Sequence, residues 1–122
     1  MSVSTVTSLD STPDVRLVLT TEADGAIAAR LARELLDRRL VACATLVTVR
    51  SMYHWEGDIE DEEEVQLQLK TVVARIDDLS DAIAELHSYE VPEFLVLSVE
   101  ASDAYGGWVD GIVAGHDAMN VE

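Results

Sequence analysis

The residues of this chain that are best suited to metal chemistry are three histidines, one cysteine and a run of carboxylates. His54 opens the stretch HWEGDIEDEEE, which covers residues 54–64 and brings an imidazole close to seven acidic side chains. Imidazole, thiolate and carboxylate groups are common metal ligands in proteins. The stretch therefore has two interpretations, a cation site or a turn with a highly charged flank.

The carboxylate run follows the pattern of a strand, which argues against a cation site. Residues 59–72 continue into alternating apolar and polar positions, and alternation of this kind is typical of a β-strand. Successive strand residues point to opposite faces, so the even-numbered glutamates face away from Asp61 and Glu63. A tight calcium or magnesium site needs oxygens that converge on one ion. We therefore interpret the run as one flank of a long hairpin with its bend at Gly57 and Asp58.

The other potential ligands are far apart in the sequence. Cys43 is the only cysteine, so the chain forms no internal disulfide. If residues 41–55 form one strand, Cys43 and His54 are separated by roughly 36 Å, at about 3.3 Å per residue. Cys43 is then a small buried residue or a ligand shared between subunits. His87 follows an amphipathic segment, where it is either a polar residue at a helix C-terminus or a metal ligand.

The charge of the chain excludes several classes of partner. Its 24 acidic and 8 basic residues give a net charge of -16, which repels nucleic acid and anionic membranes. An acidic surface of this kind suggests adaptation to high salt, where screening weakens self-repulsion, so a halophilic source is a hypothesis. The first fourteen residues lack the basic and apolar regions of a secretory signal, and no apolar stretch is long enough to span a membrane. We expect a cytoplasmic protein.

Hydrophobic periodicity predicts an α+β fold with the order β-α-β-β-α-β and one added helix. The expected elements are a strand from Val15, a helix from the capping signal Thr21–Asp24 to Arg39, strands over 41–55 and 59–72, a helix over 76–86, a strand over 94–100 that is buried on both faces, and a helix over 104–114. This order is that of a ferredoxin-like sandwich with strand order 4-1-3-2 and two helices on one face.

The predicted domain covers residues 15–114, between a flexible N-terminal tail at 1–14 and a C-terminal tail at 115–122. Helices on only one face leave the second face of the sheet partly bare, and the hairpin is longer than one small domain covers. Association of several copies through that face is the expected remedy.

Three segments resemble the CutA divalent-cation tolerance proteins: RLVACATL at 39–46, SMYHWEGDIEDEEEVQLQLKT at 51–71 and LHSYEVPEFLVLSVE at 86–100. The resemblance implies a compact homotrimer, similar in architecture to the PII signalling proteins, whose long hairpins pack against neighbouring subunits. It also implies a link to tolerance of copper and other divalent metals. Within this resemblance, Trp55 is expected at a subunit interface.

The metal ligands of the family carry over only in part. Bacterial members described as copper-binding have a cysteine at the end of the first strand and a histidine pair before a proline. Here these positions hold Thr20, Leu86, His87 and Ser88. Copper favours thiolate, thioether or imidazole ligands, and His87 is the only such donor among the four. The resemblance therefore implies weak copper binding, with His87 as the candidate metal ligand and no obligatory cofactor.

No enzyme motif is present. The chain lacks G-x-S-x-G, a glycine-rich phosphate loop followed by lysine, H-E-x-x-H and C-x-x-C, so we expect a non-catalytic protein. The alternative function is that of a PII-like regulatory trimer that binds a small molecule or a partner protein at intersubunit clefts. In that case Arg16, Arg50 and Arg75 are candidates to gather at a cleft.

Overall fold

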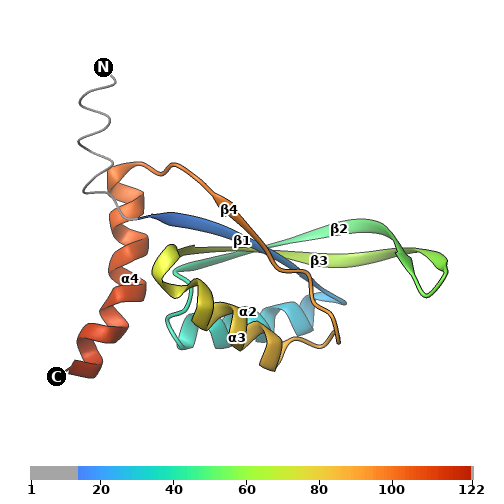
Figure 1. The fold of residues 1–122 in the computed structure, drawn as a ribbon, viewed down its shortest axis with the longest axis horizontal. Helices are drawn as coiled ribbons and strands as arrows, with labels where there is room; N and C mark the ends of the chain where they lie inside the picture. The colour runs from blue at the N-terminus through green and yellow to red at the C-terminus, as the bar shows by residue number, and fades with distance from the viewer. Residues whose placement is uncertain (1–13, 122) are drawn as a thin grey trace, which may run out of the picture.

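The computed structural model describes the backbone of residues 14–121 and the side chains of residues 14–114, in the predicted order of elements (Figure 1). The elements are β1 (Val15–Glu22), α2 (Gly25–Asp37), β2 (Cys43–Trp55), β3 (Asp58–Val72), the 3-10 helix η1 (Val73–Arg75), α3 (Ile76–Leu86), β4 (Leu95–Ser98) and α4 (Asp103–Val121). The N-terminal tail prediction lies almost entirely outside the described residues.

The four strands form one antiparallel sheet in the order β2-β3-β1-β4, which confirms the predicted order. Strand β3 pairs with β1 through its second half, from Val65 to Val72, and with β2 along nearly its whole length. Between the bend and Val65, the β2/β3 hairpin therefore has no further neighbour in the sheet. It projects from the body of the molecule as a long arm (Figure 1).

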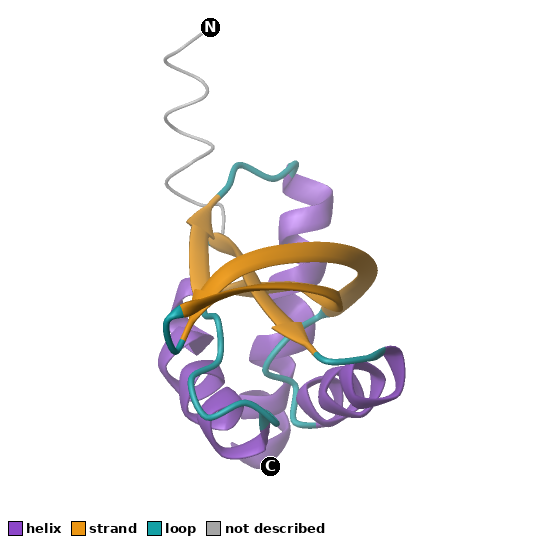
Figure 2. Cartoon of the chain, turned by 90° about the vertical axis from the view of Figure 1, so that its right-hand side faces the viewer, coloured by secondary structure: helices purple, strands orange, loops and turns teal. Residues whose placement is uncertain are grey.

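Helices α2 and α3 lie together on one face of the sheet, as predicted (Figure 2). Their apolar residues bury the side chains of alternate strand positions, including Val18, Leu67 and Leu69, which are fully buried. Helix α4 packs separately near the start of β2 and the end of β3, where Val109 and Val113 contact Ala42 and Val72. In the part of the chain that the structure describes, no helix is both long and apolar enough to cross a membrane.

Several element boundaries differ from the sequence prediction. Thr21 belongs to β1, and Asp24 alone caps α2 by accepting a hydrogen bond from the backbone N–H of Ile27 at 2.9 Å. Helix α2 ends at Asp37, two residues early, because Arg39 has a left-handed backbone with φ of 56°. Helix α4 continues through residues 115–121, which the sequence had suggested as a tail.

The prediction that the fourth strand is buried on both faces is wrong for the single chain. Strand β4 covers only Leu95–Ser98, and Leu95, Val96 and Leu97 are 51%, 43% and 40% exposed. Among the described residues it is an edge strand paired only with β1, and its side chains remain exposed there. An apolar run in the sequence shows that burial is needed, but it does not show which chain provides it.

The hairpin bend lies one residue earlier than predicted. Trp55 pairs with Asp58, so the two-residue loop is Glu56 and Gly57, with φ of 50° and 87°. Two consecutive residues with positive φ are typical of a type I′ turn, which matches the twist of the flanking strands. Glycine adopts this conformation freely, whereas glutamate adopts it at a cost.

Replacing Glu56 with asparagine is expected to stabilise the hairpin. Asparagine tolerates the left-handed conformation, so Glu56→Asn should raise the free energy of unfolding by about 0.5–1 kcal/mol in chemical denaturation. Glu56→Ala is the matched control, because it removes the same charge but keeps the unfavourable φ. Equal effects of the two substitutions would show that the charge, and not the backbone, is responsible.

Candidate functional site

His87 ends α3 and begins the segment that leads to β4. Its backbone leaves the helical region, with φ of -68° and ψ of 146°, while its N–H still donates to the carbonyl of Ile83. This position confirms the expected place of His87 at a helix C-terminus. The imidazole is fully buried against the end of β1.

Both ring nitrogens of His87 are hydrogen-bonded. Nδ1 lies 3.0 Å from the backbone nitrogen of Tyr89, and Nε2 lies 2.7 Å from the carbonyl oxygen of Thr21. A backbone N–H only donates and a carbonyl only accepts, so Nδ1 is the acceptor and Nε2 carries the proton. The imidazole thereby joins α3, the following segment and β1.

A buried carboxylate lies beside this imidazole. Glu22 is fully buried, and its Oε2 lies 3.4 Å from Nδ1 of His87. It accepts a hydrogen bond from the backbone N–H of Ser88 at 3.1 Å and another from the Ser88 hydroxyl. Because Nδ1 carries no proton in this arrangement, the contact between Glu22 and His87 is a close approach of two acceptors and not an ion pair.

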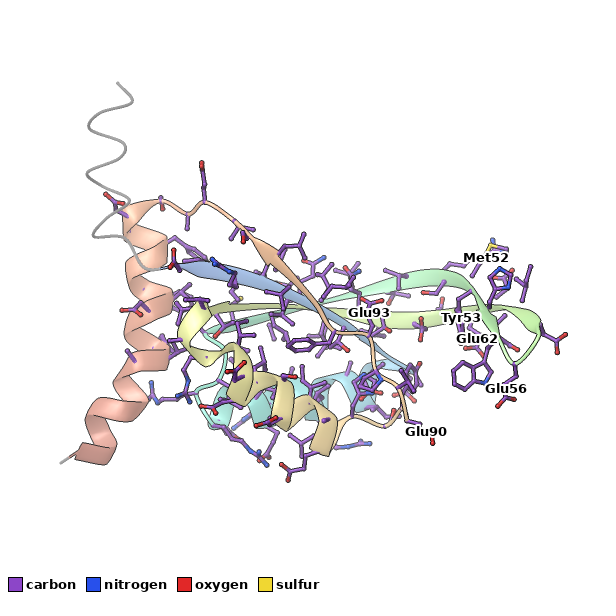
Figure 3. All side chains as sticks on the ribbon, in the orientation of Figure 1. Met52, Tyr53, Glu56, Glu62, Glu90 and Glu93 are labelled. Carbon is purple, nitrogen blue, oxygen red and sulfur yellow. The ribbon has the colours of Figure 1, made fainter. Side chains whose placement is uncertain are left out.

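A second buried carboxylate joins the same segment to the arm. The Tyr89 hydroxyl donates to Glu64, which is 5% exposed, at 2.5 Å. Farther along the arm, the Tyr53 hydroxyl donates to Glu62 at 2.6 Å (Figure 3). The hydrogen bonds of His87, Ser88 and Tyr89 thus connect residues 87–89 to both β1 and β3.

Sequence reasoning did not identify Glu22 and Glu64 as functional candidates. A usable signal existed for Glu22, because it follows Val18 and Thr20 at alternate positions of one strand and therefore faces the buried layer. Glu64 has no such signal, because it is one carboxylate of a run and its hydrogen-bond partner Tyr89 is 25 residues away.

All three tyrosines of the chain have raised pKa values. The hydrogen bond to Glu62, more than burial, raises the pKa of Tyr53 to about 12. Burial, followed by the bond to Glu64, raises the pKa of Tyr89, and burial also raises that of Tyr105. A tyrosine with a raised folded-state pKa contributes stability below its unfolded pKa of about 10 and loses that contribution as the pH rises through the folded value.

Spectrophotometric titration at alkaline pH is expected to show this shift. At a pH of about 10.5 the unfolded chain should have most of its tyrosines ionised, whereas the folded protein should have few. Glu62→Gln should lower the pKa of Tyr53 and leave that of Tyr89 raised, which absorbance difference spectra of single tyrosine-to-phenylalanine variants can assign. Normal titration of all tyrosines in the folded protein would contradict these hydrogen bonds.

Thr20, the residue at the family's cysteine position, is fully buried, and its hydroxyl has no hydrogen-bond partner within residues 14–114. Thr71 is a matched case, because it is equally buried and its hydroxyl donates to the carbonyl of Leu40 at 2.7 Å. An unpaired buried hydroxyl costs free energy, while a paired one contributes it.

Thr20→Val and Thr71→Val are therefore expected to have opposite effects. Valine keeps the shape of threonine, so the first substitution should raise the free energy of unfolding and the second should lower it, each by about 1–2 kcal/mol. Denaturant unfolding of both variants measures the difference. A loss of stability in Thr20→Val would indicate that its hydroxyl has a partner in the assembled protein.

The remaining candidate ligands that the structure describes do not come together. Cys43 is half-buried, not fully buried as expected. In the strand register it lies across from Lys70 of β3, whereas Thr21, which contacts His87, lies across from Gln66. Cys43 and His87 are therefore at different places along the sheet. Cys43 and His54 lie at opposite ends of the continuous strand β2, as predicted. Among the described residues there is no group of three or more histidine, cysteine or acidic side chains that could hold a metal ion. The side chain of His116 lies outside the described part.

The three arginines proposed for a cleft do not gather within one chain. Arg50 forms a bidentate pair with Asp61 on the arm, with distances of 2.8 and 2.6 Å. Arg75 contacts Asp78 at 3.4 Å beside α3. In the strand register, Arg16 lies across from Thr71 of β3 and Arg50 lies across from Glu63 of the same strand. These two positions are eight residues apart, which corresponds to roughly 26 Å along the strand.

A pocket of about 340 Å³ lies between α2 and the start of the segment after α3. Glu22 and Ser88 form part of its wall, together with Arg30 and Glu34 of α2 and the apolar side chains of Leu31 and Leu86. The pocket therefore places one cation and two carboxylates around a partly apolar hollow next to His87.

The face of the sheet opposite α2 and α3 is largely uncovered. The pairing register places Leu17 and Leu19 of β1 on this open face beside Leu97 and Leu95 of β4. Val47 of β2, 39% exposed, lies on the same face across Gln66 of β3. In contrast to the helix-covered face, the open face thus combines exposed aliphatic side chains with a central polar stripe of Gln66, Gln68 and Lys70.

Comparison with known proteins gives one consistent result. Residues 16–111 match the family described as CutA1 divalent ion tolerance protein. A divalent-cation tolerance protein CutA of Salmonella newport is 43% identical over 102 residues, which cover 82% of this chain and 89% of the relative. The structure of CutA from Synechococcus elongatus has a TM-score of 0.80 at 37% identity, with 84% of this chain and 92% of that chain covered. A PII-like protein CutA from Nostoc has a TM-score of 0.76 at 36% identity, with 80% and 96% covered.

Proposed function

Since this chain belongs to the CutA1 divalent ion tolerance protein family, we propose that it acts in tolerance of divalent metal ions, with copper as the principal candidate, as a non-catalytic homotrimer. The observation that carries the assembly is the open face of the sheet, which together with β4 leaves aliphatic side chains uncovered in the single chain. The name of the Salmonella relative supports the metal function.

Self-association is supported by where the exposed apolar groups lie. Leu95 and Leu97 on one edge strand and Val47 on the other are exposed on the same face. Further copies that cover this face would bury both edges and the root of the arm at once, whereas Gln66 and Gln68 would supply hydrogen bonds inside the interface. Trp55, 47% exposed near the tip of the arm, is available for contact with a neighbouring subunit.

His87, which follows α3 and contacts the end of β1, remains the proposed metal ligand. A metal ion at Nδ1 has to replace the N–H of Tyr89, and Glu22, whose Oε2 is 3.4 Å from that nitrogen, is the nearest second donor. This requirement predicts weak binding, because a hydrogen bond must be broken for each bond to metal that is formed.

The metal function is tested by deletion of the gene in its source organism and growth at raised copper concentration. We expect growth of the deletion strain to be inhibited at lower copper concentrations than growth of the parent, and the wild-type gene to restore tolerance. Equal inhibition of the deletion and parent strains would contradict the proposed function. Complementation with His87→Gln then asks whether this residue contributes to tolerance.

The alternative function is that of a PII-like regulatory protein that binds a small molecule. Its specific support is the pocket lined by Glu22, Arg30 and Ser88, together with the PII-like description of the Nostoc neighbour. A thermal-shift screen against nucleotides and small anions tests it. A ligand whose stabilising effect disappears in Arg30→Ala favours this alternative, and a screen without stabilising compounds argues against it.

The proposed setting is the cytoplasm of an organism with high internal salt. The net charge of -16 in 122 residues opposes folding and assembly at low ionic strength, and molar salt screens that repulsion within a few ångströms. The melting temperature should therefore rise steeply between dilute buffer and molar potassium chloride. Full stability in dilute buffer, with no gain on adding salt, would contradict the halophilic interpretation.

A further inference from the structure

His54 has free ring nitrogens, in contrast to His87. Both nitrogens of His87 are hydrogen-bonded, whereas the exposed side chain of His54 forms no hydrogen bond or ion pair with residues 14–114. A neutral imidazole offers one nitrogen lone pair to a metal ion. Of the two histidines whose side chains are described, only His54 offers that lone pair without loss of an existing contact.

An exposed thioether lies on the same face of the arm as His54. Met52 is 64% exposed and precedes His54 by two positions in the continuous strand β2. The register pairs Met52 with Asp61 and His54 with Ile59, so both side chains leave the hairpin on one face. Met52 projects from the side of the arm opposite Tyr53 and Glu62 (Figure 3).

The two positions across from this pair offer no free carboxylate. Asp61, directly across from Met52, is held at both oxygens by Arg50, at 2.8 and 2.6 Å. Ile59, across from His54, is apolar and 66% exposed. This face of the arm therefore presents a soft sulfur and an imidazole nitrogen, and the carboxylate across from Met52 already has a cationic partner.

We propose that Met52 and His54 together form a copper(I) site on the arm. Thioether and imidazole groups select copper(I) over hard divalent ions, which favour oxygen ligands. Side chains two positions apart on one strand face are separated by about 6.6 Å along the strand, and the flexible methionine side chain can bring its sulfur toward the imidazole. The negative field of the chain raises the local cation concentration, but this donor pair provides the selectivity.

The inference deepens the proposed metal function and rests on it for its biological meaning. It also returns metal chemistry to the HWEGDIEDEEE stretch, with a different assignment of ligands. The carboxylates of that stretch are not the ligands. The donors are the histidine at its first position and the methionine that precedes it.

The test is an anaerobic titration of the full-length protein with copper(I), in competition with a chromogenic copper(I) chelator. All variants carry Cys43→Ser, so that binding by the thiol does not obscure the site. Met52→Leu and His54→Gln remove one donor each, and Glu62→Gln, an exposed position on the opposite side of the arm, is the matched control. Met52 and His54 are exposed, so circular dichroism should show an unchanged fold in their variants.

We expect tight binding of one copper(I) ion per chain, with affinity reduced at least about tenfold in Met52→Leu and in His54→Gln and unchanged in Glu62→Gln. Quenching of Trp55 fluorescence and a silver(I)-induced shift of the Met52 methyl resonance should accompany binding. Equal affinity in all variants, loss of binding in Glu62→Gln alone, or no copper(I) binding at all would each overturn the proposal. None of these results depends on the growth assay, so the proposed metal tolerance can fail or succeed separately.

Discussion

Replacement of His87 with alanine is expected to lower the free energy of unfolding by about 2–4 kcal/mol, even in buffer from which metal ions have been removed. The imidazole is fully buried and accepts from the N–H of Tyr89 while donating to the carbonyl of Thr21. Its loss leaves two backbone groups without a partner and a cavity between α3 and β1. Chemical denaturation with a chelator present measures the effect.

His54→Ala is the matched control for this prediction. His54 is exposed and has no partner among the described residues, so its replacement should change the free energy of unfolding by less than about 0.5 kcal/mol. The contrary result is that His87→Ala is as stable as His54→Ala without metal and loses stability relative to wild type only when copper is added. His87 would then be mainly a metal ligand, and its hydrogen bonds would contribute little to stability.

Replacement of Leu97 with aspartate is expected to dissociate the assembly. Leu97 lies on the open face beside Leu17 and is 40% exposed in the single chain. If this face is covered by other copies, the new carboxylate is buried once per subunit, at a cost of several kcal/mol each. The molar mass at micromolar concentration should then fall to that of one chain.

Val73→Asp separates this effect from the added charge. Val73 is 46% exposed but belongs to η1, away from the open face, so its aspartate should leave the molar mass of the assembly unchanged. Dissociation by both substitutions would show that one more negative charge is enough to separate the subunits. An intact assembly with Leu97→Asp would exclude this part of β4 from the interface.

The order of elements could be predicted from local periodicity, and the strand order then followed from the ferredoxin-like pattern of those elements. The alternation of Val65, Leu67 and Leu69 predicted one buried face of β3, and the apolar stripe of α2 predicted its place on that face. The resemblance to the family added the expectation of assembly. These features need no knowledge of which residues contact one another over long distances.

The details of the site could not be predicted in the same way. The bond between Tyr89 and Glu64 joins residues 25 positions apart, and the contact of His87 with Thr21 joins residues 66 positions apart. Neither contact leaves a periodic signal in the sequence. The hairpin bend was displaced by one residue because Glu56, an unusual residue for a left-handed position, occupies the first place in the turn.

The exposure of β4 has a similar cause. Its run of aliphatic residues has the composition of a buried strand, yet in one chain it lies at an edge of the sheet. The sequence indicates that these side chains require burial, and burial by other copies of the chain satisfies that requirement. Assembly is therefore the claim on which the interpretation of the open face, β4 and Trp55 depends.

Light scattering coupled to size-exclusion chromatography, carried out on the full-length protein in molar salt, tests this claim most directly. The predicted result is a molar mass three times the 13.3 kDa of one chain, unchanged over a tenfold dilution. A mass of 13.3 kDa under these conditions would contradict the proposed assembly, because β4 and the open face would then remain exposed in solution.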